Sequence, residues 1–151
     1  MGKAFFAGSF NPFTIGHADI VKRSLAVADE VIIGVGFNVN KPGGEENAGQ
    51  RAEKIVRLYR DEARVKVVTY SGLTVRAAEK EGADFLVRGV RNTEDFLYEQ
   101  NLAAVNKNIS GMETFLIPTD PSISFVSSSM IKELMENGAK EEAQKYLPKE
   151  K

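Results

Sequence analysis

Residues 3–17 read KAFFAGSFNPFTIGH, and this stretch decides the fold that we expect. Residues 3–8 predict a buried β-strand, whereas Asn11 and Pro12 favour a turn. From Thr14 onward the apolar residues recur at helical spacing, which predicts a helix directly after the turn. A strand, a turn and a helix in this order suit the first unit of an α/β fold.

Outward from this unit, predicted strands and helices alternate along the chain. Further strands are expected at 31–37, 65–70, 84–87 and 113–117, and helices at 51–61, 74–81, 92–109 and 128–136, with a short helical tail. The nearly continuous apolar run at 31–37 suits a parallel strand that is covered on both faces. The alternation predicts a doubly wound, five-stranded parallel sheet within a single domain, 1–151, in which 38–50 is a loop.

The composition narrows the classes of function. The 20 Lys and Arg against 21 Asp and Glu lack the excess positive charge that is typical of nucleic-acid-binding proteins. Cysteine is absent and histidine occurs once, which excludes disulfides, thiolate metal sites, Cys nucleophiles and His-rich zinc sites. No apolar run approaches the roughly 20 residues that cross a bilayer, and the N-terminus does not resemble a secretory signal. We therefore expect a cytoplasmic protein that binds neither nucleic acid nor membrane.

Polar and cationic residues gather where an open parallel sheet binds its ligands. That place is the edge formed by the carboxyl ends of the strands, where loops converge and helices present free amides. The residues expected at this edge are Ser9, His17, Lys41, Thr74, Arg88, Arg91, Ser127, Ser128 and Ser129. Positive charge combined with hydroxyls and helix N-terminal amides suits a polyanionic phosphate ligand.

The expected phosphate site belongs to neither of two familiar motifs. The chain has no G-x-x-x-x-G-K-S/T sequence, which excludes a P-loop, and Gly34 and Gly36 lack the third glycine of a dinucleotide fingerprint. Gly16 and His17 instead fall in the first turn of the first predicted helix. The backbone there is open to a base or a phosphate, and the imidazole can donate a hydrogen bond to an oxygen that gains charge.

Each of these residues also has a purely structural interpretation. A histidine in the first turn of a helix is often a cap or a packing residue, and a run of serines suits a helix start. Lys41 can be an ordinary surface charge. Arg88 and Arg91 can pair with carboxylates along the chain, namely Glu94, Asp95 or Glu99. The functional interpretation therefore depends on these residues sharing one edge of the sheet.

Four motifs together resemble one enzyme family. The T-x-G-H element at 14–17 resembles the signature of the nucleotidyltransferase superfamily. With R-G-V-R at 88–91, D-F-L-Y-E at 95–99 and S-F-V-S-S-S at 124–129, the order and spacing resemble the bacterial phosphopantetheine adenylyltransferases over nearly the whole chain. Ser9 stands where the family more usually has threonine, and Asn11 where it frequently has aspartate. We expect neither difference to remove the activity.

The resemblance implies a Rossmann-like nucleotidyltransferase fold and the transfer of AMP from ATP to 4′-phosphopantetheine, which gives dephospho-coenzyme A and pyrophosphate. It implies catalytic roles for His17, Lys41 and Arg91, with His17 stabilising the transition state. The ATP contacts that it implies are Ser9, Phe10, His17, Gly89, Val90, Arg91, Glu99, Ile123, Ser124, Phe125, Val126, Ser127, Ser128 and Ser129. The implied contacts to phosphopantetheine are Ser9, Lys41, Thr74 and Arg88.

The resemblance further implies Mg²⁺ that accompanies ATP, a homohexamer, and coenzyme A as a product or inhibitor, with no metal ligand among the side chains. Two other functions stay open at this point. One is a related nucleotidyltransferase that acts on nicotinamide or nicotinate mononucleotide or on glycerol phosphate. The other is a non-catalytic nucleotide-binding protein, which would bind ATP without releasing pyrophosphate.

Overall fold

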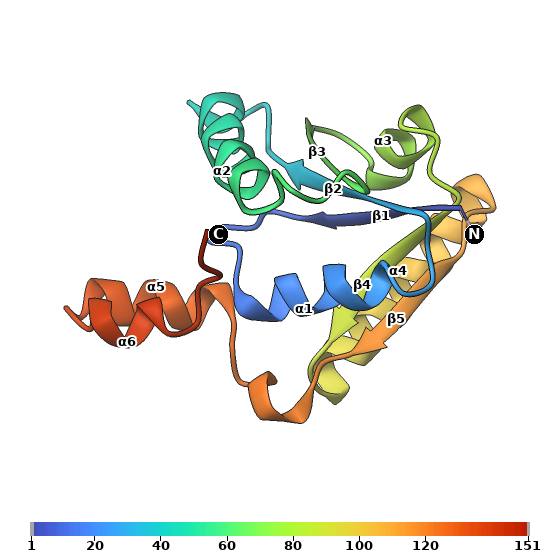
Figure 1. The fold of residues 1–151 in the computed structure, drawn as a ribbon. Helices are drawn as coiled ribbons and strands as arrows, with labels where there is room; N and C mark the ends of the chain where they lie inside the picture. The colour runs from blue at the N-terminus through green and yellow to red at the C-terminus, as the bar shows by residue number, and fades with distance from the viewer. Residues whose placement is uncertain (1, 151) are drawn as a thin grey trace.

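A single parallel sheet organises the chain in a computed structural model, which describes residues 2–150. Its strands are β1 (Lys3–Gly8), β2 (Glu30–Gly36), β3 (Val65–Tyr70), β4 (Phe85–Val90) and β5 (Thr114–Pro118), in the spatial order β3-β2-β1-β4-β5. All neighbouring strands run parallel. The doubly wound, five-stranded parallel sheet predicted from the sequence is therefore confirmed (Figure 1).

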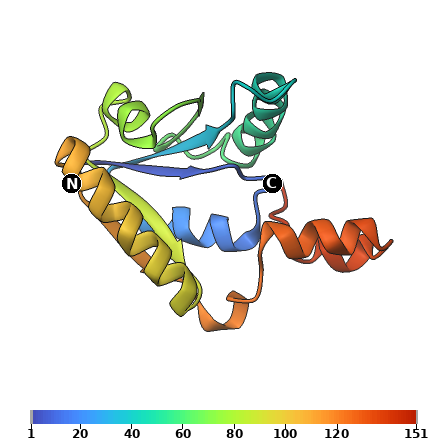
Figure 2. The ribbon, with the colours of Figure 1, turned by 180° about the vertical axis from the view of Figure 1, so that it is seen from behind.

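Helices cover both faces of the sheet. They are α1 (Ile15–Ser24), α2 (Gly44–Leu58), α3 (Thr74–Lys80), α4 (Thr93–Ser110), α5 (Ser128–Glu136) and α6 (Lys140–Gln144), and a 3₁₀ turn, η1 (Pro121–Ile123), precedes α5. α1 and α2 pack on one face and α3 on the other, where α4 lies along β4 and β5 (Figure 2). α5 and α6 pack together beside the start of α1. Within residues 2–150, no helix has the length and apolar character needed to cross a bilayer.

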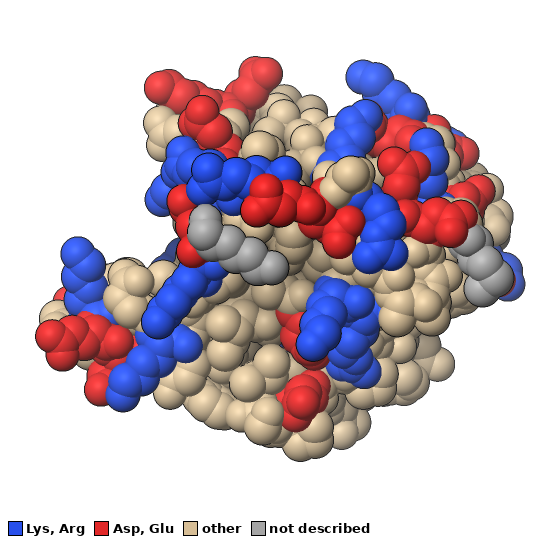
Figure 3. Space-filling model, viewed as in Figure 1, with Lys and Arg blue, Asp and Glu red and all other residues tan. Residues whose placement is uncertain are grey.

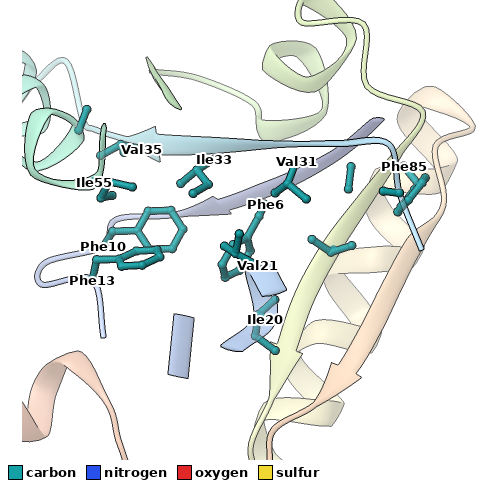
Figure 4. Packing of buried hydrophobic residues seen from close by; sticks show 14 of the residues in the cluster. Phe6, Phe10, Phe13, Ile20, Val21, Val31, Ile33, Val35, Ile55 and Phe85 are labelled. Carbon is teal, nitrogen blue, oxygen red and sulfur yellow. The ribbon is translucent and has the colours of Figure 1, made fainter. Parts of the chain in front are cut away.

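Alternate residues of the central strands fill two cores. Phe6 of β1, Ile33 of β2 and Ile55 of α2 belong to the larger core, on the face of α1 and α2 (Figure 4). Phe5 of β1 and Val75 of α3 belong to the core on the opposite face. β1 and β2 are buried along nearly their whole length, as the apolar runs in the sequence predict for strands covered on both faces.

On the face seen in Figure 3, charged residues of the two signs are intermixed. Lys and Arg lie next to Asp and Glu across the face seen in Figure 3. One surface ion pair joins the exposed Lys66 to the partly buried Glu81 over 2.9 Å. This mixed surface agrees with the near balance of charges in the sequence.

α2 begins earlier than the sequence suggested. The prediction placed a loop at 38–50 and a helix from 51, whereas the helix starts at Gly44. Glycine and asparagine in this segment hid the start. The helical spacing is nevertheless present, because Ala48, Ala52 and Ile55 lie buried along one side of α2.

β4 is longer than predicted, since the sequence suggested an end at 87. Residues 88–90 pair in register with 116–118 of β5. Arg88 and Gly89 therefore belong to a strand and not to the loop after it. A Cβ added at Gly89 would lie 3.1 Å from Cγ1 of Ile20 in α1, so Gly89 faces α1. Successive residues of a strand point to opposite faces, and Arg88 consequently points toward α4.

Two glycines test this packing as a matched pair. A Cβ added at Gly34 in β2 would overlap the ring of Phe5, whereas Gly49 in α2 has open space around it. We expect Gly34→Ala to lower the free energy of unfolding by about 1–3 kcal/mol, because the ring must move. We expect Gly49→Ala to raise it by about 0.5–1 kcal/mol, because alanine favours the helix. Urea denaturation measures both changes, and equal stability of the two variants would contradict the packing.

Candidate active site

Two pockets open at the carboxyl ends of β1 and β4. The α1 pocket, of about 390 Å³, lies on the side of α1, and the α4 pocket, of about 470 Å³, lies on the side of α4. Both pockets are lined by Ala7, Gly8, Ser9, Arg88 and Glu99. The strand order reverses between β1 and β4, and ligands of open α/β sheets bind at such a reversal.

The α1 pocket gathers hydrogen-bond donors from several segments. The predicted residues that line it are Ser9, Phe10, His17, Arg88, Gly89, Arg91, Glu99, Val126, Ser127, Ser128 and Ser129. The helices α1 and α5 both begin at this pocket. Among the described residues, the amides of Gly16 and Ser129 in their first turns have no hydrogen-bond acceptor. Free amides beside two arginines are suited to phosphate groups.

His17 is held in one orientation by the N-cap of α1. Its Nδ1 accepts a hydrogen bond from the backbone N–H of Thr14 over 2.9 Å. Its own backbone N–H donates to Oγ1 of Thr14 over 3.3 Å, which completes a reciprocal cap. Because Nδ1 must keep its lone pair to accept, the proton of the neutral ring lies on Nε2.

Its surroundings keep His17 uncharged. Burial is the main cause that lowers the pKa of His17 from 6.5 to about 4, and the charges of Arg88 and Arg91 lower it further. The rings of Phe10 and Phe13 lie 5.0 and 5.4 Å from the imidazole, between centroids, and form part of the core drawn in Figure 4. At neutral pH His17 can therefore donate a hydrogen bond through Nε2, but it carries no second proton to give.

Arg88 and Glu99 form the wall between the two pockets. Nε and Nη2 of Arg88 donate to the two carboxylate oxygens of Glu99, each over 2.8 Å. Nη1 donates to the carbonyl of Ala7 at the end of β1. Burial disfavours the charge of Arg88, but hydrogen bonding and attraction from Glu99 outweigh it and raise the pKa of Arg88. One N–H on each Nη stays available to a ligand.

Arg91 and Thr74 line different pockets. Arg91 lines the α1 pocket while it pairs with Asp95 over 2.9 Å, between Nε and Oδ2. Arg88 and Arg91 thus both have the acidic partners that their structural interpretation suggested, and both still reach the pocket. Thr74 lines the α4 pocket, and its Oγ1 lies 2.8 Å from the hydroxyl oxygen of Tyr70.

The remaining predicted residues line neither of these pockets; they are Lys41, Val90, Ile123, Ser124 and Phe125. Lys41 is exposed in the turn before α2. Phe125 is exposed and its ring packs against Tyr146. The binding roles of these residues stay predictions.

Most of the α4 pocket was not predicted. Its lining includes Phe5, Tyr70, Leu102, Asn106 and Thr114. In the sequence these residues have the spacing of ordinary core positions, so no polar signal distinguished them. The Oγ1 of Thr114 is buried without a hydrogen-bond partner among the described residues. A largely apolar lining with a few polar groups suits an uncharged organic group, whereas the α1 pocket suits phosphate.

Comparison with known proteins identifies the family. The model of the family described as cytidylyltransferase-like matches residues 5–134. A phosphopantetheine adenylyltransferase of Porphyromonas gingivalis is 51% identical over 135 residues, which cover 89% of this chain and 88% of the relative. The phosphopantetheine adenylyltransferase of Bacteroides fragilis is 42% identical over 149 residues, 99% of this chain and 97% of the relative.

The chain belongs to the phosphopantetheine adenylyltransferase family. Solved structures of other adenylyltransferases share the fold of this family member. A putative nicotinate-nucleotide adenylyltransferase from Vibrio parahaemolyticus has a TM-score of 0.62 at 18% identity and covers 99% of this chain and 95% of its own. A bifunctional NMN adenylyltransferase/ADP ribose pyrophosphatase from Francisella tularensis has a TM-score of 0.69 at 16% identity, covering 100% of this chain and 46% of its own. These likenesses confirm the Rossmann-like nucleotidyltransferase fold.

The lowered pKa of His17 predicts a pH dependence of stability. The unfolded chain binds a proton at His17 near pH 6.5, whereas the native state binds it only near pH 4. The stability that this group contributes is therefore present above pH 6.5 and is lost as the pH falls toward 4. The loss at about pH 4.5 is about 2–3 kcal/mol.

His17→Asn isolates this effect, because the Asn side-chain oxygen can still accept from the Thr14 amide but does not titrate. We expect the free energy of unfolding of the variant to fall less between neutral and acidic pH, by the amount that His17 contributes in the wild type. Free energies of unfolding of both proteins at neutral and acidic pH measure it. If the free energy of unfolding changes with pH equally in the two proteins, native His17 is not held neutral.

Proposed function

We propose that residues 1–151 act as one cytoplasmic nucleotidyltransferase domain that transfers AMP from ATP to 4′-phosphopantetheine, giving dephospho-coenzyme A and pyrophosphate. The observation that carries this proposal is the pair of unlike pockets that meet at Ser9 and Arg88. One pocket suits a polyphosphate and the other an organic arm. The relatives at 42–51% identity are named for the same acceptor.

In the proposed reaction, ATP occupies the α1 pocket and the pantetheine arm occupies the α4 pocket. A terminal phosphate oxygen of 4′-phosphopantetheine attacks the α-phosphorus of ATP, and the bond from that phosphorus to the oxygen bridging to the β-phosphate breaks. No covalent intermediate with the protein is needed. The work of the chain is to align two anions and to offset their charge.

Three kinds of group perform this work. Arg88 lies between the pockets and can bind the acceptor phosphate through its available N–H groups. His17 donates through Nε2 to an oxygen of the α-phosphate as charge accumulates there. The free amides at the starts of α1 and α5, together with Arg91, receive the departing pyrophosphate.

Magnesium enters this proposal as part of the substrate. Among residues 2–150, no group of three or more His, Cys, Asp or Glu could hold a metal ion. The α1 pocket is lined by two arginines, a histidine and several serines, which can donate hydrogen bonds to anions, and its two carboxylates, Asp95 and Glu99, are paired with the arginines. We therefore propose that Mg²⁺ arrives on the phosphates of ATP and that the chain contacts those phosphates.

The reaction is tested by incubating the purified protein with MgATP and 4′-phosphopantetheine and measuring dephospho-coenzyme A by mass spectrometry. Two variants test His17 in the same assay. His17→Asn keeps the acceptor for Thr14 but lacks the Nε2 donor, and we expect kcat to fall by about a hundredfold to a thousandfold with KM nearly unchanged. His17→Gln can place an amide donor near the position of Nε2, and we expect it to retain more activity.

Other outcomes of this assay would contradict the proposal. Wild-type kcat in His17→Asn excludes the donor role. Pyrophosphate release only with a mononucleotide of nicotinamide or nicotinate, or with glycerol phosphate, reassigns the acceptor. Binding of ATP without any release of pyrophosphate indicates a nucleotide-binding protein that has no transferase activity.

We also propose that the protein assembles as a homohexamer and that coenzyme A, which contains the same pantetheine arm, competes for the α4 pocket. The support for assembly comes from α4. Of its 18 residues Glu99 is the most buried, while Phe96, Leu97, Val105 and Ile109 are exposed. A helix that exposes this much apolar surface is suited to a contact between copies.

Light scattering after size-exclusion chromatography tests the assembly. We expect a mass of about 100 kDa, six times the 16.6 kDa of one chain. Val105→Glu should lower this mass, because it places a charge on the apolar side of α4. A wild-type protein that elutes with the mass of one chain contradicts the hexamer.

A further inference from the structure

Arg51 of α2 binds the backbone of the site without lining either pocket. Its Nε donates to the carbonyl of Ser9 over 2.8 Å. Its Nη2 donates to the carbonyl of Gly36 over 3.3 Å. The two carbonyls lie at the carboxyl ends of β1 and β2, so a single guanidinium holds both strand ends together. Arg51 itself lies outside the residues that line the α1 and α4 pockets.

The bond to Ser9 also sets the direction of an amide. The carbonyl of Ser9 and the N–H of Phe10 belong to one planar peptide group. The peptide is trans, since the cis peptide in the described chain is Asn11–Pro12. In a trans peptide the N–H points opposite to the carbonyl, and the amide of Phe10 therefore points away from Arg51. This amide has no hydrogen-bond acceptor among residues 2–150.

Phe10 adopts this conformation against its own preference. Its φ is 49°, in the left-handed region that bulky residues rarely adopt. Phe10 as a whole is 3% exposed, and its ring packs between those of Phe6 and Phe13. Rotation of the Ser9–Phe10 peptide would return φ to negative values while the ring stays in the core. The observed orientation consequently needs a group that holds the Ser9 carbonyl, and Arg51 is that group.

We propose that Arg51 is a positioning residue, which keeps the Ser9–Phe10 peptide turned so that the Phe10 N–H serves the phosphates of ATP in the α1 pocket. Ser9 and Phe10 both line that pocket. In the rotated peptide the Ser9 carbonyl would take the place of the N–H and repel the phosphates. This inference rests on the proposed function, because it assigns ATP to the α1 pocket.

A simpler role for Arg51 would be a long-range attraction of its charge for ATP, or the anchoring of α2. Arg51→Lys separates these roles from positioning, because lysine keeps the charge but cannot present a planar fork to two carbonyls. Arg51→Gln removes the charge as well. Lys54→Gln is the matched control, since Lys54 is exposed on the same helix and makes no hydrogen bond or ion pair with another described residue.

The experiment measures kcat and KM of the full chain with MgATP and 4′-phosphopantetheine. We expect Arg51→Lys and Arg51→Gln both to lower kcat/KM for ATP by about tenfold to a hundredfold, as for the loss of a hydrogen bond to a charged group. We expect a smaller change in KM for 4′-phosphopantetheine and no change in Lys54→Gln. A kcat/KM of Arg51→Lys equal to that of the wild type would overturn the proposal.

A second readout follows the peptide itself. In ¹H–¹⁵N spectra, the Phe10 amide of the wild type should shift downfield when ATP is added, and this response should be lost in Arg51→Lys. An unchanged response, or a variant that merely melts at a lower temperature with wild-type kinetics, would show that Arg51 only anchors α2. If the wild type forms no dephospho-coenzyme A, the proposed function fails, whereas the response of the Phe10 amide to ATP still decides the role of Arg51.

Discussion

The site depends on the ion pair between Arg88 and the buried Glu99. The connections after β1 and β4 leave toward opposite faces of the sheet, so their strand ends border a crevice. A carboxylate that is 5% exposed is stable as an ion only with a partner. Arg88 supplies that partner and also binds the carbonyl of Ala7. One side chain thereby joins α4 to the strand ends and divides the crevice into two pockets.

The sheet could be predicted from the sequence, because strand-like segments such as 31–37 and 65–70 alternate with segments of helical spacing. The limits of the elements could not all be predicted, since some are set by distant partners. β4 extends to Val90 only because β5 continues beside it. α2 starts at Gly44 although glycine is a poor helix former, because the buried Ala48 and Ala52 give the helix a packed side.

The residues of the candidate site also fall into those that could be predicted from the sequence and those that could not. Ser9, His17 and Arg88 could be predicted, because their residue types are unusual and their positions follow strands. The α4 pocket could not, since residues such as Leu102 and Asn106 resemble core positions until α4 packs along β4 and β5 and brings them to a pocket that β1 also lines. Lys41 is the opposite case, a cation at a predicted strand end that lies exposed. The reach of Arg51 to Ser9 depends on the packing of α2 against the sheet, which no local pattern reveals.

The shared wall has a consequence for the order in which products leave. In the proposed reaction the new phosphoanhydride (P–O–P) linkage forms across Arg88, so the joined product has one half in each pocket, whereas pyrophosphate has contacts in the α1 pocket alone. A molecule held at both ends dissociates more slowly than one held at a single end. Pyrophosphate would then depart first, and the joined product would remain as the species from which the reverse reaction starts.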